Sequence, residues 1–199
     1  MTINKELNKL DKDKLVKLIC ELYKKNKSVK DFFDYYFQPD EKGLFEKYRD
    51  KVFEAFYPKR GFHLKLKDAK QAISEFKKFE PTPKYLADLM LFYVECGVKF
   101  TNDYGDIDEN FYNSIANMYE DALKLMKKKS LLEIFIQRTD KVVTDTRGIG
   151  WGFHDELGDI NFEYHADYRD DAIESEEYNS ESDSQAKIIP LSNKVSSEN

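Results

Sequence analysis

The sequence Arg147-Gly-Ile-Gly-Trp-Gly-Phe-His-Asp-Glu-Leu-Gly-Asp159 differs in composition from all the residues before it. It holds the only tryptophan of the chain, four of its eight glycines, one of its three histidines and three carboxylates. Glycine lets a backbone approach its neighbours closely, and here it alternates with Ile149, Trp151 and Phe153. We therefore expect this segment to thread between helices and to close the fold.

The residues before this segment carry apolar side chains three and four positions apart, a spacing typical of helices that bury one face. The clearest start signal is Thr82-Pro83, a capping residue followed by proline at the first helical position. The helix behind it is the most apolar in the chain, so we expect it to be the central one. The predicted helices run from Asp11 or Asp13 to 26, and over residues 28–37, 41–57, 69–79, 83–100, 106–126 and 131–145.

These features predict an all-α fold of six to seven helices, packed in hairpins as a helical-repeat-like array and completed by the glycine-rich closing segment. A weak internal sequence similarity supports the pairing of helices. At an offset of 71 residues, Leu15, Leu18 and Tyr48-x-Asp50 fall on Leu86, Leu89 and Tyr119-x-Asp121. Two helix pairs of about 35 residues each would give that period.

Length and charge divide the chain into a body and a tail. A chain of 199 residues with 41% apolar side chains suits one helical domain, residues 1–166. Residues 167–199 hold nine acidic and three basic side chains, which accounts for the whole net charge of −6. We expect this acidic tail to be disordered, with Lys187–Leu191 as an apolar island that docks on a partner or on the body. The balanced body and its one basic run, residues 59–67, make nucleic acid an unlikely partner.

The cysteines and the hydropathy of the chain indicate the cellular compartment. Cys20 and Cys96 have no cysteine or histidine nearby in sequence, so we expect two buried thiols rather than a disulfide or a zinc site. No window reaches the eighteen or so uncharged apolar residues that a bilayer span needs, and the N-terminus lacks the apolar region of a signal peptide. We therefore expect a cytoplasmic protein with no membrane partner.

Several segments carry a resemblance to a known family. They are Leu22–Asn26, Phe56–Gly61, Ala69–Phe76, Phe92-Tyr-Val-Glu95, Phe100-Thr-Asn-Asp-Tyr-Gly-Asp-Ile-Asp108, Phe111-Tyr-Asn113 and Gly148–Asp159. In these the chain resembles an uncharacterised bacterial family, Domain of Unknown Function family 6155, over most of residues 7–165. The resemblance implies one intact domain, and it implies no activity, cofactor or catalytic residue.

The candidate site lies where two irregular breaks, residues 101–109 and 147–160, come together. Exposed aromatic and polar side chains in such breaks are available for binding. The candidate binding residues are Tyr104, Asp106, Arg147, Trp151, His154, Asp155, Glu156 and Asp159. No metal-ligand spacing is present, so we predict neither a metal nor a cofactor, and no residue can be assigned as catalytic.

Two functions fit these residues. The favoured one is a non-catalytic, cytoplasmic protein-interaction module with a partner of unknown identity. The alternative is an enzyme at the same place. Arg147 and His154 lie seven residues apart, which is similar to the active-site pattern of the all-helical HEPN ribonuclease superfamily, although three glycines intervene. Asp155 and Asp159, one helical turn apart, suit a cation-dependent hydrolase.

Overall fold

The computed structural model describes residues 2–61 and 63–166, and within them it consists of helices without a strand. The helices are α1 (Ile3–Leu7), α2 (Lys12–Lys25), α3 (Lys27–Phe37), α4 (Glu41–Phe56), α5 (Leu66–Lys77), α6 (Pro83–Tyr104), α7 (Glu109–Lys128), α8 (Leu132–Asp145) and a final helix over residues 153–166. The all-α fold is confirmed. The expected number of helices, six to seven, is wrong, because α1 and the final helix bring the count in this part to nine. The predicted acidic tail lies outside the described residues.

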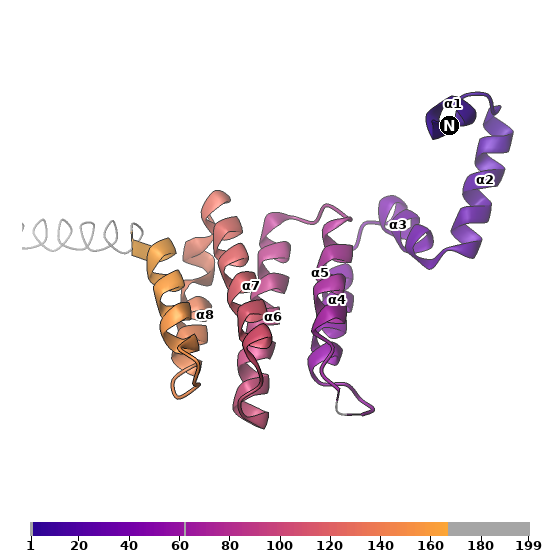
Figure 1. Ribbon diagram of the computed structural model, residues 1–199. Coiled ribbons are helices and arrows are strands. Elements are labelled where there is room, and N and C mark those ends of the chain that lie inside the picture. Colours follow the sequence, from indigo (N-terminus) through magenta and orange to yellow (C-terminus); the bar gives the residue numbers. More distant parts are fainter. Residues whose placement is uncertain (1, 62, 167–199) are drawn as a thin grey trace, which may run out of the picture.

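From α4 onward, consecutive helices lie side by side as an array of antiparallel pairs (Figure 1). Helix α6 contacts α4, α5, α7 and α8, so the most apolar helix is also the central one. Nine of its residues are buried. Phe56 of α4, for example, packs edge-on against Tyr93 of α6, with ring centroids 5.2 Å apart.

The break after α6 is shorter than the sequence predicts. Helix α6 continues to Tyr104, and Gly105 then turns the chain at φ +87°. The cap of α7 is Asp108, whose carboxylate accepts a hydrogen bond from the Phe111 amide at 2.8 Å. Asp106, where the sequence predicts the helix to begin, instead lies in the break and accepts a hydrogen bond from the Tyr112 hydroxyl at 3.0 Å. The break therefore consists of four residues.

Helices α2 and α3 form a hairpin at the N-terminal end of the array, separate from the packed pairs (Figure 1). Asp11 caps α2 as expected, and Asn26 caps α3, which begins one residue before the predicted range of 28–37. Neither helix has a buried residue, and the core is built from α4 onward. Cys20 on α2 is consequently exposed, which contradicts the expectation, whereas Cys96 on α6 is buried as expected.

Only the second half of the glycine-rich segment inserts into the core, because Phe153 and Leu157 are buried whereas residues 147–152 stay at the surface. The expectation that the glycine-rich residues themselves thread between helices is wrong. Residues 147–152 form a surface turn in which Gly148 and Gly152 have positive φ angles, and a Cβ atom on either would touch nothing within 4 Å. These glycines serve to reverse the chain. The final helix starts at Phe153 and buries Phe153 and Leu157, four residues apart on one face. Trp151, just before that helix, points into solvent with 66% of its surface exposed.

In residues 2–61 and 63–166 there is no helix that is both long enough and apolar enough to span a bilayer.

Candidate functional site

The two breaks lie against each other at one end of the array. A Cβ atom placed on Gly150 would lie 3.5 Å from a carboxylate oxygen of Asp106. The side chain of Tyr112 joins the two breaks, because its hydroxyl donates to Asp106 and its ring packs against Phe153 at a centroid distance of 4.8 Å. The Asn102 amide also donates to the backbone carbonyl of Asp145 at 2.9 Å. We call the surface formed by residues 104–108 and 147–159 the loop-end surface.

Two aromatic side chains of the loop-end surface face solvent. Trp151 has φ +64°, a conformation that bulky residues rarely adopt, and it is exposed. Tyr104 is 61% exposed, and its ring lies 4.7 Å from that of Phe100, which in turn packs on Phe111 at 6.2 Å. The Tyr104 ring is therefore fixed to the core through Phe100.

The side chain of His154 is half-buried and oriented by a buried hydroxyl. The Thr146 hydroxyl donates its proton to the Val143 carbonyl at 2.6 Å. A hydroxyl has only one proton, so the Thr146 oxygen accepts a hydrogen bond from Nδ1 of His154, which lies 2.8 Å away. Because Thr146 is fully buried, this bond fixes the ring plane and leaves Nε2 as the proton acceptor.

The charged candidates of the loop-end surface do not converge on His154. Arg147 is exposed and follows the end of α8, whereas His154 belongs to the final helix, so the two do not share one helix as the resemblance to the HEPN superfamily requires. Asp155, Glu156 and Asp159 are exposed on the final helix. Throughout the described part of the chain, no three histidine, cysteine or acidic side chains gather as metal ligands.

Sequence reasoning missed a groove of about 520 Å³ between α6 and α8. Its most constrained residue is Arg138, which donates to Asp88 at 2.7 Å and to both oxygens of Glu95 at 2.8 and 2.9 Å. Burial lowers the pKa of Arg138, but the hydrogen bonds that it donates to the two carboxylates outweigh this effect and raise the pKa overall. No motif reveals this cluster, because Arg138 lies 43 residues after Glu95 and 50 residues after Asp88 in sequence.

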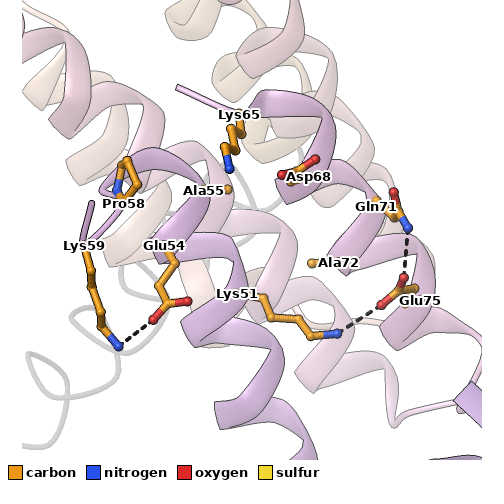
Figure 2. A pocket seen from close by; sticks show the side chains of 10 residues that line it. All are labelled: Lys51, Glu54, Ala55, Pro58, Lys59, Lys65, Asp68, Gln71, Ala72 and Glu75. Carbon is orange, nitrogen blue, oxygen red and sulfur yellow. Dashed lines mark hydrogen bonds and ion pairs between the residues drawn. The ribbon is translucent and has the colours of Figure 1, made fainter. Parts of the chain in front are cut away.

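A second groove, of about 480 Å³, lies between α4 and α5 on the side that α6 does not cover (Figure 2). Its floor is Ala55 and Ala72, and most of its rim is charged, with Lys51 paired to Glu75 and Lys59 paired to Glu54. Lys51 donates to Glu75 at 3.0 Å, and that bond, with one from Gln71, holds the pKa of Glu75 below its usual range. This face of the α4–α5 pair is therefore polar.

The third concavity is apolar and belongs to the N-terminal hairpin. Val16 and Ile19 of α2 and Phe33 and Phe37 of α3 line a groove of about 540 Å³. Thirteen large apolar side chains are exposed in the described part of the chain, and eight of them lie in α1–α3. The sequence shows the same apolar spacing here as in the core helices, so only the structure distinguishes this surface from a core.

No curated protein and no solved structure matches this chain. The sequence profile of one family, described as Family of unknown function (DUF6155), matches residues 1–165. The match includes the N-terminal hairpin, the helical array and the final helix to within one residue of its described end. Because it covers well over half of the chain, this protein belongs to the Family of unknown function (DUF6155).

Proposed function

We propose that this protein is a non-catalytic, cytoplasmic interaction module whose loop-end surface binds a protein partner, with Trp151 as the anchor. One observation carries the proposal: the single tryptophan is exposed at a positive φ angle. A left-handed conformation costs a non-glycine residue roughly 1–2 kcal/mol. In the isolated protein the ring is exposed, so no burial of apolar surface offsets this backbone cost. A partner that covers the ring would bury that surface and offset the cost.

The chemistry around Trp151 indicates the kind of partner. Tryptophan is enriched among the few residues that dominate binding energy at interfaces. The loop-end surface also carries the exposed carboxylates of Asp106, Asp155, Glu156 and Asp159, and Asp106 lies next to Gly150, the residue before Trp151. Such a rim favours a cationic segment and speeds its association. The partner segment should therefore combine an apolar side chain with lysine or arginine.

The test compares proteins captured on the immobilised full-length chain and on two matched variants. Trp151→Ala removes the anchor. Phe162→Ala removes an equally exposed aromatic ring at a different place, on the final helix. The proposal expects a set of proteins that wild type and Phe162→Ala retain and Trp151→Ala loses. Binding of a purified member should also shift the fluorescence of Trp151 to the blue. Identical sets from all three proteins contradict the proposal.

The alternative of a HEPN-like ribonuclease or a cation-dependent hydrolase rests on His154. Its Nδ1 is engaged by Thr146, which leaves Nε2 available as a general base. Incubation of wild type with single-stranded RNA, with and without Mg²⁺, tests this alternative. Cleavage that disappears in both Arg147→Ala and His154→Ala, with unchanged melting temperatures, would replace the interaction proposal. The interaction proposal expects no cleavage, and it expects His154→Ala with Asp159→Ala to retain the partner.

A further inference from the structure

We propose that the groove of the α2–α3 hairpin is the docking site of the chain's own segment Lys187-Ile-Ile-Pro-Leu191, which we call the tail island. The tail then folds back over the body of the same chain and covers an apolar surface that the helical array leaves open. Neither Trp151 nor any other part of the loop-end surface takes part in this contact.

The groove faces away from the body. On α3, Asp31 pairs with Lys47 of α4 at 3.0 Å, and Tyr35, one turn further along, also packs on the body. Phe33 and Phe37, which line the groove, each lie two residues beyond these contacts. Two residues advance a helix by about 200°. The body therefore contacts one face of α3, and the opposite face is open to another occupant.

The size of the groove suits a short apolar segment. Its volume is about 540 Å³. Pockets that enclose small ligands measure about 300–1,000 Å³. A space of this size takes a few side chains, such as those of Ile188, Ile189 and Leu191, rather than a whole helical hairpin.

The groove and the tail island each carry one charge, and the two charges are opposite in sign. Asp34 is the one charged residue among those that line the groove, and its carboxylate accepts a hydrogen bond from the Tyr23 hydroxyl at 2.6 Å. Lys187 is the one charged residue of the tail island. When the apolar residues of the tail island lie in the groove, the Lys187 ammonium can pair with Asp34 at its edge.

A second pair of charges continues this match beyond the groove. Lys30 lies one turn before Asp34 on the same face of α3, and its ammonium is 5.9 Å from the centre of the Tyr23 ring. In the tail, Asp183 lies four residues before Lys187. With Lys187 on Asp34, Asp183 therefore comes near Lys30. The order of charges along the tail is thus the one that α3 requires.

The wider charge distribution also favours the hairpin over the rest of the body. Residues 167–199 are acidic, and they follow residues 101–166, which hold 7 basic and 13 acidic side chains. Residues 1–30 hold nine lysines and four acidic side chains. The tail is therefore repelled by the end of the body from which it leaves and attracted by the hairpin at the other end.

The tail is long enough to reach the groove. From the final helix, the array leads through α7, α6 and α4 to α3 (Figure 1). At about 8–10 Å between neighbouring helix axes, these four steps span about 40 Å. The 21 residues from 167 to 187 can extend over about 70 Å. A tethered segment has an effective concentration on the order of 1 mM, so a Kd of about 0.1 mM fills the groove about 90% of the time.

Cys20 serves as the probe, because its exposed thiol lines the groove and an occupant shields it from a maleimide. Cys96 does not interfere, since it is buried and burial raises the pKa of its thiol to about 12. In the full-length chain, Ile189→Glu should speed the labelling of Cys20 about tenfold, as expected for a groove that is filled about 90% of the time. The matched control Ile173→Glu changes an apolar residue of the tail outside the tail island, and it should label as slowly as wild type.

A charge exchange tests the pairing of Lys187 with Asp34. Lys187→Asp and Asp34→Lys should each speed labelling about threefold, as expected for loss of an exposed ion pair. The double variant should be as well protected as wild type, because the pair is restored with its charges exchanged. Each rate is divided by the rate of the same variant carrying Ile189→Glu, so that the effect of a nearby charge on the thiol cancels.

Equal labelling of wild type and Ile189→Glu would overturn the proposal, and so would loss of protection in Ile173→Glu. Protection should be independent of protein concentration, and light scattering should give the mass of one chain, 23.5 kDa. Protection that appears only in a dimer would assign the groove to a second copy. Protection that appears only on vesicles of anionic phospholipid would assign it to a lipid surface. Partner capture through Trp151 is unaffected by any of these results.

Discussion

Gly97 of α6 lies directly against Ile115 of α7. A Cβ atom on residue 97 would lie 2.8 Å from Cγ1 of Ile115 and closer still to Cδ1, and Ile115 is fully buried. Glycine inside a helix costs about 1 kcal/mol relative to alanine, so its presence in the central helix needs a reason. The reason is that α6 and α7 can approach only where residue 97 has no side chain.

Gly97→Ala should therefore destabilise the protein, by roughly 1–2 kcal/mol in urea unfolding. Overpacking of a buried site typically costs about 1–3 kcal/mol, which exceeds the gain in helix propensity. In the background of Ile115→Ala, the same substitution should become stabilising, since the clash is gone. An equal loss in both backgrounds would contradict the close approach.

Arg138→Lys should cost roughly 1–3 kcal/mol in the free energy of unfolding. Lysine keeps the charge but cannot make the two parallel bonds to Glu95 while also reaching Asp88. The matched control is Lys141→Ala on the same helix, which breaks an exposed pair with Asp145. That substitution should change stability by less than about 0.5 kcal/mol. Similar losses for both variants would show that the Arg138 cluster has no special role.

Stability should fall as the pH rises above about 10. Burial raises the pKa of Tyr93 from 10.0 to about 12, despite the opposing effect of its hydrogen bond with Ser114. In that interval the unfolded chain loses the phenol proton while the folded chain keeps it, so unfolding becomes more favourable as the pH rises. Below pH 10 this contribution is constant. Urea unfolding measured from about pH 8 to about pH 12 gives the slope.

Tyr93→Phe is the control for this alkaline loss. It removes the ionisable group, so the decline above about pH 10 should become shallower. At neutral pH it should cost roughly 1 kcal/mol, because Ser114 loses its partner in the core. An unchanged slope would assign the alkaline loss to other groups, such as the Cys96 thiol, whose pKa is also about 12.

Substitutions at the exposed Trp151 should cost much less stability than substitution of the buried Phe153. Trp151→Gly should be more stable than Trp151→Ala by roughly 1 kcal/mol, because only glycine accepts the positive φ angle without strain. Phe153→Ala should cost about 3–5 kcal/mol, because its ring is buried against Tyr112. Melting temperatures of the three variants test this. A large loss in Trp151→Ala would mean that the ring is buried after all.

The sequence correctly predicts the local features of this protein. The all-α class, the start of α6 at Pro83 and the cap of α2 at Asp11 depend on side chains within one or two turns of each other. The central position of α6 follows from its composition, since a helix that is apolar on several faces must pack against several other helices. The proximity of the two breaks was also foreseen, whereas their function as a binding site stays a prediction.

Other features depend on which surfaces meet. The sequence of an amphipathic helix is the same whether or not another helix of the chain covers its apolar face. The patterns of α2 and α3 therefore cannot be told from those of core helices. Likewise, alternating aromatics do not show which ring is buried. The start of the final helix determines which ring is buried. Because the helix begins at Phe153, Phe153 and Leu157 face the core and Trp151 lies on the exposed turn. Local spacing sets where helices form, but burial is a property of two surfaces, and only the tertiary structure brings both together.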